Sequence, residues 1–105
     1  MWALNTLGGH RRKGFGIHIS INNLESLAKK IIYCLYCGME LDWTSGNKNN
    51  SPKLNSPSLD RINNEKELRM DNIRILCYGC NRTKGNKTHK DFIIFCNKIS
   101  QKFEI

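Results

Sequence analysis

The chain of 105 residues carries 17 lysine and arginine residues against 9 aspartate and glutamate residues, which gives a formal net charge of +8 at pH 7. A chain of this length folds as one small domain with a limited core, so a bound metal ion or a crosslink would help to stabilise it. No apolar run approaches the roughly 20 residues of a membrane-spanning helix, so we expect no membrane partner. The positive charge favours a polyanionic partner such as nucleic acid, and the alternative is a basic surface that only contacts solvent.

Residues 1–16 predict a flexible basic arm rather than a packed element. Four glycines surround the basic segment at residues 10–13, and such a composition is typical of a mobile segment. We expect Arg11, Arg12 and Lys13 to contact the phosphate groups of nucleic acid. The segment also lacks the continuous apolar stretch of a secretory signal, so we expect an intracellular protein.

Residues 17–105 predict a single domain that begins with a strand and a helix. Ile17, Ile19 and Ile21 alternate with polar residues, which is the period of a short strand. Asn22 is expected to cap the helix that follows. Apolar residues then recur at helical spacing and indicate a face buried in the core: Leu24, Leu27, Ala28, Ile31 and Ile32.

Four of the five cysteines form two units with identical spacing, Cys34 with Cys37 and Cys77 with Cys80. They could form disulfides or hold a metal ion. Disulfides belong to oxidising compartments, so an intracellular chain favours the metal. Two CxxC units supply the four thiolates that structural zinc often takes. The sequence therefore predicts a zinc site at these four cysteines, and we expect Cys96 to be an ordinary core residue.

The middle of the chain predicts a hairpin, a loop and two strands. Residues 33–43 contain the first CxxC unit and are expected to form a small hairpin around the metal. Residues 44–58 hold both prolines and few apolar side chains, which predicts an exposed loop. Two apolar stretches at residues 59–62 and 73–76 predict paired strands. The overall fold class is therefore α+β.

Two helices are expected after the second CxxC unit. The first is short and ends at Gly85. Thr88 is expected to cap the second, with Asp91 three positions later. The buried face of this last helix is predicted to hold Phe92, Phe95, Cys96, Ile99 and Phe103.

The motifs follow one another in an order that resembles a known family. After the first CxxC unit come "PSLDRIN" at residues 57–63, "DNIRILCYGCNRTKGN" at 71–86 and "THKDFIIFCNKI" at 88–99. This order resembles the HNH endonucleases of the ββα-metal (His-Me finger) type, and in particular a small phage-like subgroup in which Asp-Arg replaces Asp-His. The resemblance covers residues 17–99. It implies a zinc-stapled, treble-clef-like α+β domain with flanking helices that cuts DNA with a divalent metal ion.

The resemblance also implies roles for individual residues. Asp60 would be one oxygen ligand of a catalytic Mg²⁺ or Mn²⁺ ion, and Asn81 would give a second through its amide oxygen. Asn72 would fix the loop between the strands by bonding to its backbone. These assignments match the chemistry, because phosphodiester hydrolysis needs a divalent cation to offset phosphate charge and a base to activate water.

The residue after the aspartate departs from the family, which has its general base, a histidine, at that position. Arg61 stays protonated and cannot accept the proton. Three explanations remain open. The base is one of His10, His18 and His89, with His18 preferred because it lies on a predicted strand; or the metal ion activates water alone while Arg61 clamps the phosphate; or catalysis has been lost.

Further basic residues near the second CxxC unit are expected to contact DNA phosphates: Arg74, Arg82, Lys84 and Lys87. The alternative function is a non-catalytic zinc-binding module for nucleic acid, and a zinc-stabilised module for protein interaction is a third. The resemblance also implies that a compact nuclease of this kind acts as a homodimer when it cuts both strands.

Overall fold

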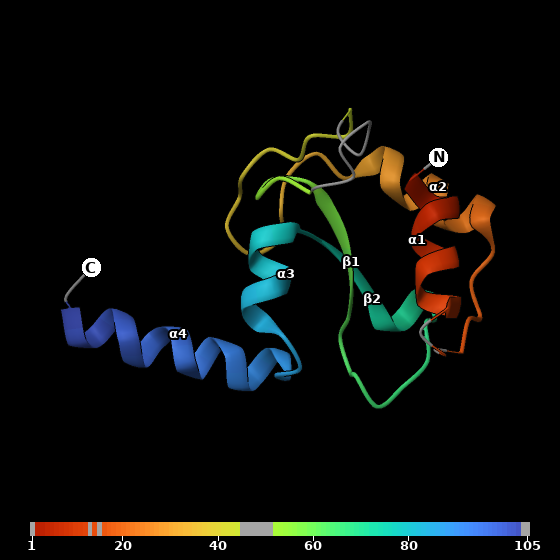
Figure 1. Cartoon of the computed structure of the whole chain (residues 1–105). Coiled ribbons are helices and arrows are strands. Elements are labelled where there is room, and N and C mark those ends of the chain that lie inside the picture. The colour runs from red at the N-terminus through yellow and green to blue at the C-terminus, as the bar shows by residue number, and fades with distance from the viewer. Residues whose placement is uncertain (1, 13, 15, 45–51, 104–105) are drawn as a thin grey trace.

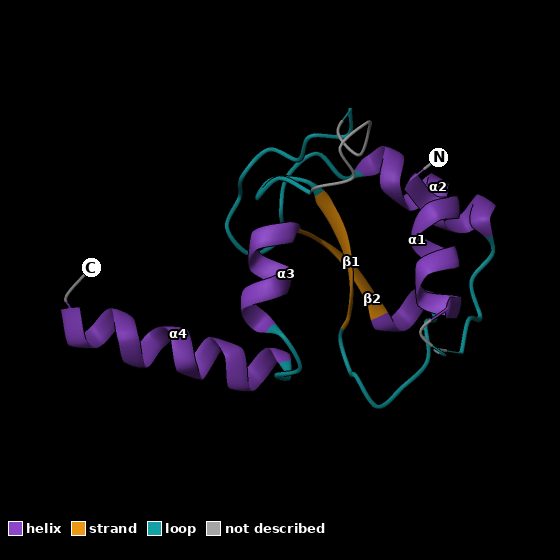
Figure 2. Cartoon of the chain, viewed as in Figure 1, coloured by secondary structure: helices purple, strands orange, loops and turns teal. Residues whose placement is uncertain are grey.

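The structure is a computed structural model that describes residues 2–12, 14, 16–44 and 52–103. Over these residues the chain is a small α+β domain with a two-stranded antiparallel sheet and four helices (Figure 2). The fold class predicted from the sequence is thus confirmed at this level. In chain order the elements are α1 (Trp2–Arg12), α2 (Ile21–Lys30), β1 (Pro57–Arg61), a 3-10 turn η1 (Met70–Asn72), β2 (Ile73–Cys77), α3 (Tyr78–Lys84) and α4 (His89–Phe103).

The sheet places three polar residues, Ser58, Asp60 and Arg74, on one face. β1 and β2 pair so that Pro57 lies opposite Cys77 and Asp60 lies opposite Arg74. Side chains alternate along a strand, so Ser58 and Asp60 share the face on which Arg74 lies. The loop predicted over residues 44–58 ends earlier than expected because Pro57 and Ser58 already belong to β1; residues 45–51 of that loop lie outside the described residues.

Helix α3 follows β2 without a loop and packs against both strands. Cys77 caps it, because its Sγ accepts a hydrogen bond from the N–H of Cys80 at 3.3 Å. The helix ends at Gly85, whose φ of 57° lies in the left-handed region that favours glycine. The predicted end of this helix is confirmed. Figure 1 shows the strands between α3 on one side and α1 and α2 on the other.

The prediction of a flexible arm over residues 1–16 is wrong for residues 2–12, because these residues form helix α1. Ala3 and Leu7 lie one helical turn apart and are 1% and 3% exposed. The indole Nε1 of Trp2 donates to the carbonyl oxygen of Pro57 at 3.2 Å. These tertiary contacts outweigh the low helix propensity of the two glycines inside α1, since packing supplies most of the stability of a short helix.

The strand expected at residues 17–21 is reduced to one bridge between Ile17 and Leu68. Helix α2 begins at Ile21, the residue at which the strand was expected to end. Its cap is Ser20, whose Oγ accepts from the N–H of Asn23 at 3.0 Å. The expected cap Asn22 is wrong because this residue already lies in the first turn of the helix.

Helix α4 begins where the sequence predicts, and Thr88 Oγ1 accepts from the N–H of Asp91 at 3.1 Å. Its predicted buried face is wrong except at Phe92, because the helix projects away from the rest of the domain (Figure 1). The exposed members of that face are Phe95, Cys96, Ile99 and Phe103. No helix in the described part of the chain is long and apolar enough to cross a membrane.

Candidate functional site

The four cysteines of the two CxxC units gather near the start of α3. The Sγ atoms of Cys34, Cys37, Cys77 and Cys80 all lie within 4.8 Å of one another, and those of Cys37 and Cys77 are 3.7 Å apart. Four sulfurs placed about 2.3 Å from a central zinc at tetrahedral angles lie about 3.8 Å apart. None of these thiols is joined in a disulfide. The cysteines that the sequence predicts as ligands therefore form a cluster that can bind a zinc ion.

A tight hairpin presents the first pair of sulfurs. Tyr33 and Glu40 form an antiparallel bridge, and the N–H of Cys34 donates to the carbonyl oxygen of Met39 at 2.8 Å. Gly38 adopts a φ of 76° at the turn, which a glycine reaches without steric cost. The second pair comes from the end of β2 and the first turn of α3, so a metal ion bound by all four sulfurs would join the hairpin to the strand–helix junction.

The thiols differ in their readiness to ionise. Burial raises the pKa of the Cys77 and Cys80 thiols. Burial acts in the same direction on Cys34, but contacts with the backbone amides of Cys37, Cys77 and Tyr36 outweigh it and lower the pKa of Cys34 to about 7. A zinc ion that bound here would therefore have to displace protons from Cys77 and Cys80.

A second candidate site is a cleft of about 500 Å³ bordered by α1, β1 and α3. Of the residues that the sequence singled out, it brings together Asp60, Arg61, Asn81, Arg82 and His10. The cleft wall from α1 also includes Asn5, Thr6 and Gly9. Sequence reasoning missed these three because it treated their segment as an arm.

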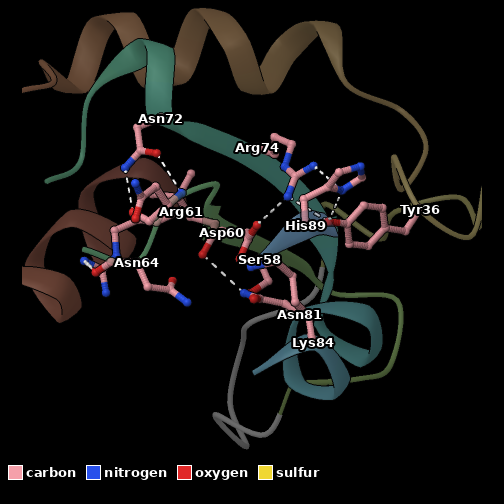
Figure 3. A network of polar contacts seen from close by, with 12 residues as sticks. Tyr36, Ser58, Asp60, Arg61, Asn64, Asn72, Arg74, Asn81, Lys84 and His89 are labelled. Atoms are coloured by element: carbon pink, nitrogen blue, oxygen red, sulfur yellow. Dashed lines mark hydrogen bonds and ion pairs between the residues drawn. The ribbon is translucent and has the colours of Figure 1, made fainter. Parts of the chain in front are cut away.

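Asp60 lies at the centre of a buried charge cluster. Its Oδ1 accepts from Lys84 Nζ at 3.1 Å and its Oδ2 accepts from Arg74 Nη2 at 3.2 Å (Figure 3). The side chains of Lys84 and Asp60 are 0% and 3% exposed, and that of Arg74 is 14% exposed. The expectation that Lys84 contacts DNA phosphates is therefore wrong. This lysine faces the sheet, where Asp60 supplies the counter-charge that a buried ammonium group requires.

Arg74, which was expected to contact a DNA phosphate, forms hydrogen bonds within the protein. Its Nη2 donates to the Tyr36 hydroxyl at 2.7 Å, and its Nη1 donates to His89 Nδ1 at 3.1 Å. Its guanidinium lies 5.0 Å from the centre of the Tyr36 ring. The arginine thus connects the hairpin, the sheet and the start of α4. Tyr36 belongs to this group of polar contacts around Arg74, and the sequence analysis did not identify it. Its position between the two cysteines of the hairpin could have indicated that it lies near the cysteine cluster.

Asn81 points one end of its amide at β1. Its Nδ2 donates to Ser58 Oγ at 2.6 Å and to the carbonyl oxygen of Leu59 at 3.2 Å. The Leu59 carbonyl accepts only, so it fixes which end of the amide carries the nitrogen. The amide Oδ1 is the other end, and no described residue donates a hydrogen bond to it. It is the atom that could bind a cation in the cleft.

The donor set fits a magnesium or manganese ion in kind, because Mg²⁺ takes one or two carboxylates and fills its shell with water and substrate phosphate. The net charge of the donor set fits a divalent cation less well. Asp60 is the one carboxylate of the set, and its negative charge is already paired with Lys84 and Arg74. An ionised carboxylate has about four lone pairs that can accept a contact. The Asp60 carboxylate could therefore contact Lys84, Arg74 and a metal ion at the same time. The ion would be held jointly with a phosphate group rather than by the protein alone.

Asn72 and Arg61 both hold the loop between the strands. Asn72 Oδ1 accepts from the N–H of Asn63 at 2.8 Å, and its Nδ2 donates to the carbonyl oxygens of Asn63 and Glu67 at 3.1 and 2.9 Å. This is the loop-fixing geometry expected of Asn72. Arg61 Nη1 donates to the carbonyl oxygens of Asn64 and Lys66 at 2.9 and 3.1 Å, so these bonds hold the same loop.

The remaining basic residues fall into different surroundings. Arg82 Nη1 donates to the Tyr78 hydroxyl at 2.6 Å at the edge of the cleft. Arg11 is exposed on α1, and the exposed Lys87 lies over the Phe95 ring at 5.3 Å. The side chain of Arg12 and all of Lys13 lie outside the described residues.

Comparison with known proteins identified no match among protein families, curated proteins or solved structures. The structure has a small α+β domain with four cysteines that can bind zinc, and it has a separate cleft bordered by α1, β1 and α3.

Proposed function

We propose that the chain is a zinc-stapled HNH-type endonuclease that hydrolyses phosphodiester bonds of DNA with Mg²⁺ or Mn²⁺. The observation that carries this proposal is that Asp60, Asn81 and His10 come from three separate elements and border one cleft. A carboxylate, an amide and an imidazole are the groups that such a hydrolysis needs for a cation and a base.

The order of the elements supports the proposal. Two antiparallel strands lead directly into α3, and the cysteine cluster lies at the junction of β2 and α3. This is the ββα order that the resemblance to HNH nucleases implies. The zinc would do no chemistry in this arrangement. It would hold α3 in register with the strands, so that Asn81 stays beside β1.

The divalent ion would supply the Lewis acid that offsets negative charge on the phosphate and on the leaving oxygen. Asp60 and Asn81 are the residues that would hold it. Lys84 and Arg74 fix the position of the Asp60 carboxylate, and their charges disfavour a resident ion when DNA is absent. We therefore expect the protein to bind Mg²⁺ weakly alone and more tightly together with DNA.

Positive charge supports DNA as the partner. The cleft is bordered by Arg61 and Arg82, and the chain as a whole carries a formal charge of +8. Cations attract the phosphate backbone and set the position of the protein on it without reading bases. Cleavage of both strands would require a second copy of the chain, as the resemblance implies.

The second candidate is a non-catalytic module that binds nucleic acid. One observation favours it: both oxygens of Asp60 are already paired with cations. In that case Asp60 would serve only to neutralise the buried Lys84. A plasmid-nicking assay separates the two functions.

Nicking of supercoiled plasmid in the presence of Mg²⁺ or Mn²⁺ tests the proposal. Removing Asp60 alone would leave Lys84 buried without its counter-charge, so the informative variant is Asp60→Asn combined with Lys84→Met. Asp71→Asn is the matched control, because Asp71 is an exposed carboxylate outside the cleft. We expect the wild type and the control to nick the plasmid and the double variant to be at least 100-fold slower, with one zinc per chain in all three.

Two outcomes would contradict the proposal. Equal nicking by the double variant and the wild type would indicate a contaminating nuclease and remove the catalytic assignment. DNA binding by the wild type without nicking, under either ion, would favour the non-catalytic module.

A further inference from the structure

We propose that Tyr36 and His89 are positioning residues that limit Arg74 to one hydrogen bond with Asp60, so that the Asp60 carboxylate keeps room for a divalent cation. The inference rests on the proposed nuclease function for the identity of that cation. The restraint on Arg74 itself follows from the described geometry.

Arg74 makes fewer contacts with Asp60 than its shape allows. A guanidinium beside a carboxylate commonly forms two parallel hydrogen bonds. Among the described contacts, Arg74 donates to Asp60 through Nη2 alone, at 3.2 Å. Its Nε is buried and has no hydrogen-bond partner among the described residues. Buried donors without a partner are rare and call for an explanation, and the Asp60 carboxylate next to it is the obvious acceptor.

Two acceptors hold the guanidinium on the side away from Asp60. Figure 3 shows Arg74 between the Asp60 carboxylate on one side and the Tyr36 and His89 side chains on the other. Nη2 donates to the Tyr36 hydroxyl at 2.7 Å, and Nη1 donates to His89 Nδ1 at 3.1 Å. These two bonds orient the guanidinium so that Nη2 is the nitrogen that reaches Asp60.

The two acceptors also bond to each other. A guanidinium only donates, so His89 Nδ1 carries the lone pair. The Tyr36 hydroxyl lies 2.8 Å from this nitrogen, so it can donate its own hydrogen to His89 while it accepts from Arg74. The Tyr36 and His89 rings are stacked with their centres 5.6 Å apart. Arg74, Tyr36 and His89 therefore form a closed triangle of hydrogen bonds.

The backbone of Tyr36 belongs to the cysteine cluster. Tyr36 lies between Cys34 and Cys37, and its amide bonds to the Cys34 thiol and helps to lower the pKa of that thiol. The same residue thus contacts the cysteine cluster through its backbone and Arg74 through its side chain. A zinc ion in the cluster would therefore help to keep Tyr36 in place.

The consequence for Asp60 is spare capacity to bind a cation. Its Oδ1 accepts from Lys84 and its Oδ2 accepts from Arg74, which uses two of about four lone pairs. A second bond from Arg74 would occupy a third lone pair and bring more positive charge to the place where the ion binds. Without the Tyr36 hydroxyl, we expect the guanidinium to turn and form that second bond through Nε.

Tyr36→Phe tests the inference because it removes the hydroxyl and keeps the ring, with its contacts to His89, Phe92 and Arg74. In the zinc-loaded complex with a short DNA duplex, we expect this variant to bind Mn²⁺ at least about fivefold more weakly, the lower end of typical coupling between sites. DNA affinity and zinc content should be unchanged. Electron paramagnetic resonance measures the bound ion after subtraction of the Mn²⁺ that the duplex alone takes up. Tyr33→Phe is the matched control, since Tyr33 lies in the same hairpin and is 58% exposed, and it should stay within twofold of the wild type.

A double-mutant cycle shows whether Tyr36 acts through Arg74. Arg74→Met removes the guanidinium, so no second bond to Asp60 can form in that background. We therefore expect Tyr36→Phe to change the Mn²⁺ affinity of the Arg74→Met protein by less than twofold.

A readout independent of cation binding is the Arg74 Nε hydrogen, observed by ¹H–¹⁵N correlation spectra of the zinc-loaded protein without DNA. We expect its signal to move downfield in Tyr36→Phe, because this hydrogen gains a carboxylate acceptor, and to stay in place in Tyr33→Phe.

Three results would overturn the inference. The first is a loss of Mn²⁺ affinity in Tyr36→Phe that is smaller than about fivefold. The second is a loss of twofold or more when the same change is made in the Arg74→Met background. The third is an Arg74 Nε signal that Tyr36→Phe leaves in place. A wild-type complex that takes up no Mn²⁺ would instead refute the proposed function, and the restraint on Arg74 would then be decided by the Nε signal alone.

Discussion

Replacing Asp60 with asparagine should strongly destabilise the domain, because it leaves the Lys84 ammonium group buried without its counter-charge. The two side chains are 3% and 0% exposed and meet at 3.1 Å. Removing one partner of a buried ion pair costs about 3–5 kcal/mol. A domain of this size loses about 4 °C in Tm for each kcal/mol, so Asp60→Asn should lower Tm by at least about 12 °C.

Two further variants show whether the charge is the cause. Lys84→Met should cost less than Asp60→Asn, since Asp60 then keeps Arg74 at 3.2 Å. The double variant Asp60→Asn with Lys84→Met removes both members of the pair and should be more stable than Asp60→Asn alone, by at least about 2 kcal/mol, because the two effects are coupled.

Thermal unfolding of the zinc-loaded proteins, followed by circular dichroism, measures these differences. Zinc content must be equal in all samples, because loss of the metal would lower Tm by itself. A Tm of Asp60→Asn within about 4 °C of the wild type would refute the reasoning. A double variant that is less stable than Asp60→Asn would refute it as well.

Three more predictions concern the parts that position the cleft. Cys37→Ser, or chelation of the metal, should reduce zinc from one ion per chain to none and lower the helical circular dichroism signal; an unchanged spectrum without zinc would show that the metal is not structural. Asn72→Ala should cost about 2–3 kcal/mol in chemical denaturation because it breaks three hydrogen bonds to the loop, and a cost below about 0.5 kcal/mol would contradict this. Gly85→Ala should lower the free energy of unfolding by about 1–2 kcal/mol, because φ is 57° at this position. The cause would be backbone strain and not a clash, since the nearest atom to an added Cβ is 3.9 Å away. Equal stability of the variant and the wild type would show that this cap does not constrain α3.

The cluster of four cysteines could be predicted from the sequence because its signal is local. Each CxxC unit brings its own two sulfurs close together, and the repeat of the spacing indicates a shared ligand. The start of α4 could also be predicted, since Thr88 and Asp91 form a capping pattern within one turn. The face that α4 buries could not, because periodicity shows that a helix is amphipathic without showing what covers it.

The features that were missed depend on contacts between distant residues. Helix α1 contains two glycines, and it is held by packing of Ala3 and Leu7 and by the bond from Trp2 to Pro57. Lysine is almost never fully buried unless it is paired, and the partner of Lys84 lies 24 residues earlier in the chain. The same error about α1 hid the proximity of His10 to the cleft.

The most direct test of the central claim is the anomalous scattering of Mn²⁺ in crystals of the zinc-loaded protein bound to a short DNA duplex. The account predicts a manganese peak about 2.1 Å from an Asp60 carboxylate oxygen and from Asn81 Oδ1, with a DNA phosphate oxygen in the same coordination shell. A phosphate in the cleft with no manganese beside it, and with Lys84 and Arg74 still paired to both Asp60 oxygens, would contradict the account.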